Sequence, residues 1–246
     1  MIYFLKIVLC FTILILFTNR LQAQGIPVKN FYPDSLTNQE IAILKSKYGT
    51  NKELIVTYEN QMLIALSYFP ELKDIHIKFK VKNRTTPLAT RPAFFSMLRS
   101  AKKRTYIITI SKKSTTYLDT IIFKNLNYNA QIGVLGHELC HISDYLNKGF
   151  GKITVIALNE IFSKKAVDKF EFNTDLNCIN HGLGYQLLDW STNIRENLKR
   201  VNWLGAVNLT TDEKSERYMN PTTIHTILVK HPLYQETKKI TSNCQD

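Results

Sequence analysis

Apolar residues recur along this chain with two different spacings, and the spacing changes from helical to strand-like and back. In the N-terminal part, apolar side chains return every three or four positions, which predicts two helices. Thr37 and Glu40 form a capping-box pattern at the start of the first helix. Asn51 is the expected cap of the second helix, which ends at Pro70. Residues 74–82 then alternate strictly between apolar and polar side chains, as a half-buried strand does.

The remaining elements follow from the same two patterns. Runs rich in β-forming residues indicate two more strands, and apolar steps of three and four residues indicate the helices of the second half. In chain order these elements are a short helix over 93–100, strands over 105–111 and 119–123, and helices over 129–147, 153–178, 185–200 and 220–228. This order indicates an α+β fold with a small antiparallel or mixed sheet and a mostly helical C-terminal part.

Residues 1–23 differ in composition and are set apart from the folded domain. Lys6 is followed by an almost unbroken apolar run over 7–17, and Ala23 offers a small residue for cleavage. These features predict a secretory signal peptide, so that residues 24–246 form a single domain that is periplasmic or secreted. A retained N-terminal membrane anchor is the alternative, although the apolar run is short for a stable span.

Basic residues outnumber acidic ones, and the formal net charge is +12, or +10 once the signal peptide with Lys6 and Arg20 is removed. A basic exported protein is attracted to anionic surfaces such as lipid headgroups, polysaccharide and acidic protein. The lysines are spread along the chain and no nucleic-acid-binding motif is present, which argues against a nucleic-acid partner. An anionic surface of the cell envelope is therefore an expected partner, unless the charge only keeps the surface solvated.

Three cysteines remain outside the signal peptide, at positions 140, 178 and 244. An odd number of thiols does not make a disulfide framework. Cys140 and Cys178 both lie on predicted helices, and we expect them to be buried free thiols rather than a bridge.

The predicted helix over 129–147 contains the sequence His-Glu-Leu-Cys-His. Residues four apart share one face of a helix, so His137 and His141 point the same way, about one turn apart. Two imidazoles in this arrangement can bind one Zn²⁺ ion and leave other coordination positions open. Glu138 lies beside the pair and can take a proton from water, the general-base role that this motif has in metalloproteases.

A third ligand is expected from the polar cluster over 169–178. Glu171 and Asp175 are four residues apart on one helix face, and Glu171 follows His141 by 30 residues, enough for a connection and a return helix. Glu171 would complete a set of two histidines and one carboxylate with one position left for water. Asp175 could accept the outer N–H of a ligand histidine. His181 is the rival candidate for the third ligand.

The two motifs, H-E-x-x-H and E-x-x-x-D, together resemble those of the gluzincin metallopeptidases. The run Glu-Phe-Asn-Thr-Asp is most similar to the E-x-x-A-D of the HtpX and CAAX-prenyl-protease type. Thr174 stands where that family usually has alanine, and its multiple membrane spans are absent. The resemblance, which covers residues 129–184, implies a zincin-like fold in an exported relative. It also implies that the zinc ligands are His137, His141 and Glu171, that the general base is Glu138, and that the residue supporting a histidine is Asp175.

From these residues we expect a zinc-dependent metallopeptidase that acts on a protein or peptide substrate. The oxyanion of the tetrahedral intermediate needs a donor besides the metal, and Tyr218, His225 and Tyr185 are the candidates. Residues 105–111 are the expected exposed strand edge, where an extended substrate would bind through backbone hydrogen bonds. One alternative is a non-catalytic zincin-like protein that binds the cell envelope, with a structural or absent metal. Another is an immunity or inhibitor-like protein that kept the fold.

Overall fold

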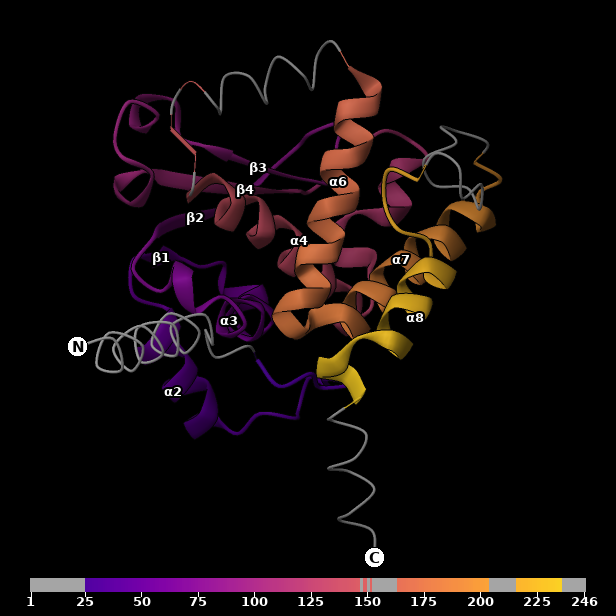
Figure 1. Cartoon of the computed structure of the whole chain (residues 1–246), viewed down its shortest axis with the longest axis horizontal. Helices are drawn as coiled ribbons and strands as arrows, with labels where there is room; N and C mark the ends of the chain where they lie inside the picture. Colours follow the sequence, from indigo (N-terminus) through magenta and orange to yellow (C-terminus); the bar gives the residue numbers. More distant parts are fainter. Residues whose placement is uncertain (1–24, 147, 150, 152–162, 204–215, 236–246) are drawn as a thin grey trace, which may run out of the picture.

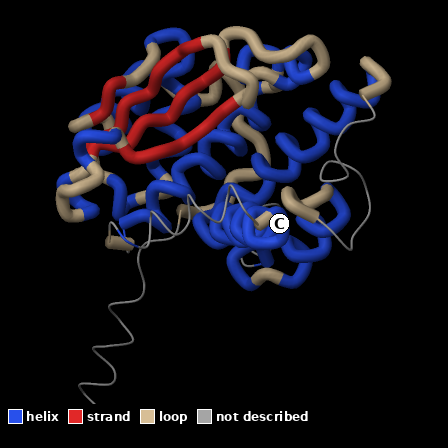
Figure 2. Tube along the Cα trace, turned by 90° about the horizontal axis from the view of Figure 1, so that it is seen from above, coloured by secondary structure: helices blue, strands red, loops and turns tan. Residues whose placement is uncertain are grey.

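The computed structural model describes residues 25–146, 148–149, 151, 163–203 and 216–235 (Figure 1). The predicted signal peptide, Cys244 and the stretch 153–162 lie outside the described residues. Figure 2 shows a small sheet at one side of the molecule, with the long helices packed beneath it. The α+β class expected from the sequence is confirmed. None of the helices in the described part of the chain has the length and apolar character needed to cross a membrane.

The sheet has four strands in the order β1-β2-β4-β3. Their bounds are Lys52–Glu53 for β1, His76–Lys82 for β2, Leu88–Pro92 for β3 and Thr105–Ser111 for β4. β2 is parallel to both β1 and β4, whereas β3 is antiparallel to β4, so the sheet is mixed. The predicted alternation is present in the first part of β2, where Ile77 and Phe79 are buried and Lys78 between them is partly exposed. It fails at Val81, which is exposed.

The helices pack around α4, which carries the His-Glu-Leu-Cys-His sequence. Their bounds are Asn38–Tyr48 for α2, Glu59–Ser67 for α3, Tyr128–Leu146 for α4, Lys164–Cys178 for α6, Gly184–Arg200 for α7 and Pro221–Lys230 for α8. α4 contacts α3, α6, α7 and β3, and 14 of its 19 residues are buried. The predicted capping box at Thr37 and the cap of α8 at Asn220 are both present.

Some elements differ from the expectation because tertiary packing, rather than local composition, decides them. Asn51 has a positive φ of 61° and leads into β1, so α3 begins only at Glu59. The helix expected over 93–100 contains only a 3-10 turn at Phe94–Ser96. Residues 119–123 lie in 3-10 turns instead of a strand. Their apolar side chains are buried in the core, and their backbone does not pair with the sheet.

β3 was not predicted, and it changes which strand forms the edge of the sheet. Pro87 precedes this strand and Pro92 ends it, and the missing N–H of proline is tolerated there because the strand lies at a sheet edge. The expectation that residues 105–111 form the exposed edge is wrong. β4 pairs with β2 on one side and with β3 on the other, so that β3 is the edge strand next to α4.

Close contact between α4 and α7 depends on a glycine. A Cβ atom placed on Gly133 would lie only 2.1 Å from the backbone oxygen of Gln186, and this backbone cannot move aside as a flexible side chain would. Gly182, at the junction of α6 and α7, has a φ of 99°, which L side chains rarely adopt. The first glycine lets two helix backbones touch, and the second lets the chain turn between α6 and α7.

We therefore expect Gly133→Ala to lower the free energy of unfolding by about 2 kcal/mol or more, because the added methyl group overpacks a backbone contact. The matched control is Gly149→Ala, where an added Cβ meets nothing within 4 Å. Its effect should stay below about 1 kcal/mol. Urea denaturation of both variants measures the difference, and equal stabilities would contradict the described packing of α4 on α7.

Candidate metal centre

Helix α4 presents two histidines on one buried face. The rings of His137 and His141 lie 4.8 Å apart between centroids, at an interplanar angle of 89°. Both side chains are buried, because α6 and α7 pack over this face of α4. The helical spacing seen in the sequence thus places two imidazoles side by side in the interior.

Helix α6 brings a carboxylate to the same point. The Oε2 atom of Glu171 lies 3.0 Å from Nε2 of His137 and 3.5 Å from Nε2 of His141. The three ligand atoms all lie within 4.8 Å of one another. Ligand atoms around a tetrahedral zinc ion are separated by about 3.3 Å, given metal–ligand bonds of about 2.0–2.2 Å. Two imidazole nitrogens and one carboxylate oxygen at these separations fit a divalent metal ion such as zinc.

Asp175 holds the other nitrogen of His137. Its Oδ1 lies 2.8 Å from Nδ1 of His137, and its Oδ2 accepts a hydrogen bond of 2.8 Å from the backbone N–H of Met219. With Nδ1 protonated by this contact, Nε2 of His137 is the nitrogen that remains for a metal. Both oxygens of Asp175 are used in positioning, so this carboxylate supports a ligand and leaves the third ligand position to Glu171.

The charges at this centre stabilise one another. Burial alone would lower the pKa of His137, but hydrogen bonds and the negative charges of Asp175 and Glu171 outweigh it and raise this pKa well above its ordinary value. Burial would raise the pKa of Glu171, but hydrogen bonds from the two histidines hold it far below the ordinary range. A divalent cation would replace the proton on Nε2 of His137, on the side that faces Glu171, so metal binding should release a proton.

Two buried polar atoms at the centre have no hydrogen-bond partner among the described residues. These atoms are Oε2 of Glu138 and Nδ1 of His141. A buried carboxylate oxygen without a partner carries a desolvation cost of about 1–3 kcal/mol, which folded proteins rarely leave uncompensated outside functional sites. Glu138 therefore has an oxygen free for a ligand at the position next to the two histidines.

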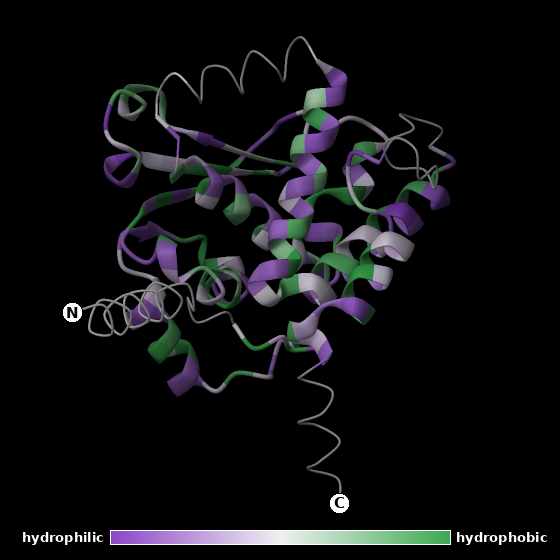
Figure 3. Ribbon diagram, viewed as in Figure 1, coloured by the Kyte–Doolittle hydropathy of each residue, from purple (hydrophilic) through white to green (hydrophobic). Residues whose placement is uncertain are grey.

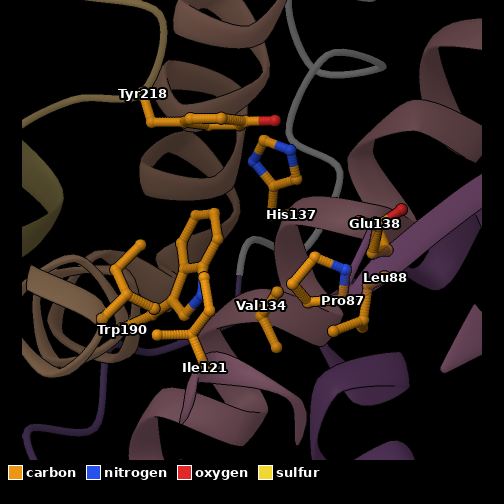
Figure 4. A pocket seen from close by; sticks show the side chains of 9 residues that line it. Pro87, Leu88, Ile121, Val134, His137, Glu138, Trp190 and Tyr218 are labelled. Carbon is orange, nitrogen blue, oxygen red and sulfur yellow. The ribbon is translucent and has the colours of Figure 1, made fainter. Parts of the chain in front are cut away.

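A pocket of about 110 Å³ opens beside these groups (Figure 4). His137 and Glu138 form its polar side, and Tyr218 lies across it from Glu138. The remaining walls are apolar and consist of Pro87, Leu88, Ile121, Val134, Trp190 and Ile194. The pocket thus joins a carboxylate and an imidazole to a hydrophobic surface, with the edge strand β3 at one side.

Tyr218 is the only one of the three predicted oxyanion donors that lines this pocket. Its ring lies 5.7 Å from that of His137, and burial together with the nearby carboxylates raises its pKa well above the ordinary value. The phenol therefore stays protonated and can donate a hydrogen bond. Tyr185 packs on Tyr234 instead, and His225 lies exposed on α8.

His181, the rival third ligand, is engaged elsewhere. Its Nε2 lies 3.1 Å from Oε1 of Glu71, its Nδ1 lies 2.7 Å from the backbone oxygen of Asn177, and its ring stacks on Phe69. Both ring nitrogens are thus used in holding the end of α6 to the turn after α3. Of the described residues, only His137, His141 and Glu171 form a cluster that could hold a metal ion.

Two aromatic residues of the site were not singled out from the sequence. The ring of Trp190 lies 5.2 Å from that of His137, and this side chain also lines the pocket. Phe170 stacks on His141 at 5.2 Å. Its position directly before Glu171 was a signal available in the sequence. Cys140 and Cys178 are buried free thiols, as predicted.

The chain matches no protein-family model, no curated protein and no solved structure in three separate comparisons. The chemistry of the site is therefore inferred from its own residues and their geometry.

We expect the protein to bind one zinc ion per chain, and Glu171→Gln or His141→Ala to weaken binding more than about 100-fold, because each removes a ligand. Asp175→Asn should weaken binding by about 10–100-fold, since it loosens His137 without removing a ligand. His181→Ala is the control and should retain zinc affinity. Competition with a coloured chelator measures all four. Full affinity in the Glu171→Gln variant would exclude the proposed ligand set.

Proposed function

We propose that the protein is a zinc-dependent metallopeptidase of the gluzincin type with a zincin-like fold. The observation that carries this proposal is the convergence of His137, His141 and Glu171 beside the unpaired, buried carboxylate of Glu138. Metal ligands and a free general base next to a pocket are the components that metal-assisted hydrolysis requires.

An open metal site is favoured over a closed, structural one. A structural zinc needs four protein ligands, and Asp175 and Cys178 are the side chains on α6 that could serve as a fourth donor. Both oxygens of Asp175 are taken by His137 and Met219, and Cys178 lies against Gly136 and is absent from the cluster of possible ligands. Three donors among the described residues leave one coordination position of the metal for water and substrate. This favours a catalytic site over the alternative of a non-catalytic protein with a structural metal.

The residues of the pocket can divide the chemistry of amide hydrolysis among them. Bound zinc would activate a water molecule and polarise the scissile carbonyl. Glu138 would accept the proton of the attacking water with its unpaired oxygen and deliver it to the leaving amine. Asp175 keeps the ring of His137 in one orientation during these steps. Tyr218, as a neutral donor across the pocket, would hydrogen-bond the developing negative charge on the carbonyl oxygen.

The walls of the site suggest how a peptide would bind. β3 is the edge strand beside α4, and an extended substrate could add to it through backbone hydrogen bonds, whatever its side chains. The apolar walls beside Glu138 favour a substrate with a hydrophobic side chain next to the scissile bond. We retain export, as a periplasmic or secreted protein, as part of this proposal on the basis of residues 1–23.

The test of the general base is Glu138→Gln, which removes the proton acceptor and keeps the shape of the side chain. We expect zinc affinity to remain within about threefold of the native protein while chelator-sensitive cleavage of casein falls by about 10²–10⁴-fold. Glu196→Gln, on the exposed face of α7, is the matched control and should leave cleavage unchanged. Activity of Glu138→Gln within about tenfold of the native protein would contradict the assignment.

The test of the oxyanion donor is Tyr218→Phe, which removes one hydroxyl from the pocket. We expect kcat to fall by about 10²–10³-fold with little change in KM, because the hydrogen bond forms only as charge develops on the carbonyl oxygen. Tyr185→Phe, at the tyrosine that packs on Tyr234, should keep native kcat. Native kcat in Tyr218→Phe, or an equal loss in the two variants, would contradict a specific role for the Tyr218 hydroxyl.

A further inference from the structure

A turn of unusual composition joins the edge strand β3 to β4. Phe94, Phe95 and Leu98 are 72%, 92% and 83% exposed, and they follow one another within five residues. The rings of Phe94 and Phe95 lie 5.5 Å apart, edge to face. Large apolar side chains gathered on the surface of a protein mark an interaction site more often than chance exposure.

The turn is held in place by buried polar contacts. The hydroxyl of Ser96 donates to the backbone oxygen of Ala93 over 2.8 Å and accepts from the backbone N–H of Thr105 over 3.2 Å. The buried guanidinium of Arg104 donates to the backbone oxygens of Met97 and Arg99. The three apolar side chains are thus presented outward by an ordered turn that the start of β4 supports.

Basic side chains surround this turn. Arg91, Arg99, Lys102 and Lys103 are all exposed. Figure 3 shows the apolar turn in green directly next to a hydrophilic turn in purple, at the left end of the sheet. An apolar tip with a basic rim is therefore built from one short segment of chain.

The positive charge of the whole protein is concentrated in the same region. Residues 75–118 contain eleven lysines and arginines and no aspartate or glutamate, against a formal net charge of +12 for the entire chain. Acidic residues near this stretch include Glu53 on β1, which pairs with Lys78, and Asp74, which lies near Arg99, Lys102 and Lys103. Nothing acidic within this stretch opposes the approach of an anionic surface to the turn.

We propose that residues 91–103 form a membrane-docking surface, which inserts Phe94, Phe95 and Leu98 into the interface of an anionic lipid bilayer. Aromatic and aliphatic side chains gain free energy at the boundary between headgroups and acyl chains, and adjacent basic residues bind anionic headgroups. A protein partner would need a complementary hollow lined with acidic residues, whereas a bilayer fits a protruding apolar tip without one. This surface does not require metal or peptidase activity.

The position of the turn has a consequence for the pocket. β3 runs from Leu88, which lines the pocket, to Pro92, directly before the turn. Five residues of strand span about 17 Å, so docking would hold the pocket within about 20 Å of the bilayer. Substrates anchored in or bound to that membrane would then meet the edge strand at close range.

Phe95→Trp in the full-length chain provides a local reporter of docking. We expect its added fluorescence to shift to the blue and to lose about half its intensity with phosphatidylcholine–phosphatidylglycerol vesicles that carry a nitroxide near the acyl-chain ester, because the turn inserts about 5–10 Å. Val56→Trp, at a residue that is 88% exposed outside the turn, is the matched control and should show neither change. The unmodified chain supplies the background of its native tryptophans.

A vesicle flotation assay with charge variants tests the basic rim. Each basic side chain near an anionic surface raises partitioning about fivefold, so the triple change Arg99→Gln, Lys102→Gln and Lys103→Gln should weaken binding about 100-fold. The control removes three positive charges from α7 and α8, on the opposite side of Figure 1, as Lys199→Gln, Arg200→Gln and Lys230→Gln. It should bind within about threefold of the native chain, since charges beyond a Debye length are screened.

The outcomes separate lipid binding from its rivals and from the proposed catalysis. Glu138→Gln should dock like the native chain, so that loss of peptidase activity and loss of docking are independent results. Equal quenching of the Phe95→Trp and Val56→Trp reporters would overturn the proposal. An equal loss of vesicle binding in the rim variant and in the control variant would also overturn it. Self-association of the chain without vesicles, abolished by Phe94→Ser and Phe95→Ser, would overturn it as well.

Discussion

One buried carboxylate, that of Asp175, ties the site together. Its two oxygens join His137 on α4 to the backbone of Met219, at the start of the C-terminal segment, while its own helix carries Glu171 one turn earlier. A buried charge is costly unless it is hydrogen-bonded on every side, so this contact fixes three stretches of chain relative to one another. The position of Tyr218 beside His137 follows, because Tyr218 directly precedes Met219.

Around this contact the polar groups are unequally satisfied. Both oxygens of Asp175 have partners, in His137 and the backbone N–H of Met219, and Oε2 of Glu171 contacts both histidines. In contrast, Oε2 of Glu138, at the wall of the pocket, has no partner among the described residues. Natural proteins depart from complete polar pairing mainly where function requires it. This contrast supports the proposed division of roles, in which Asp175 positions a metal ligand and Glu138 transfers a proton.

The sequence predicted those features that depend on local spacing. The placement of His137 and His141 on one helix face, and of Glu171 and Asp175 on another, followed from four-residue steps. β3 was not predicted because proline is unfavourable within a central strand and is tolerated only in an edge strand. The sequence alone does not show that this strand lies at the edge of the sheet. The approach of α6 to α4 depends on tertiary packing across a long connection, and no local pattern reports it. The concentration of positive charge in residues 75–118 can be read from the sequence. It is revealed by the absence of aspartate and glutamate there, because the lysines are spread along the whole chain.

We infer that α4 and α6 supply two imidazole nitrogens and one carboxylate oxygen to a single metal ion. X-ray absorption spectroscopy of the zinc-loaded protein tests this most directly. We predict two imidazole ligands and further oxygen ligands at about 2.0–2.2 Å, with no sulfur neighbour. A sulfur scatterer at about 2.3 Å, which would implicate the thiols of Cys140 or Cys178, or a signal with fewer than two imidazoles, would contradict it.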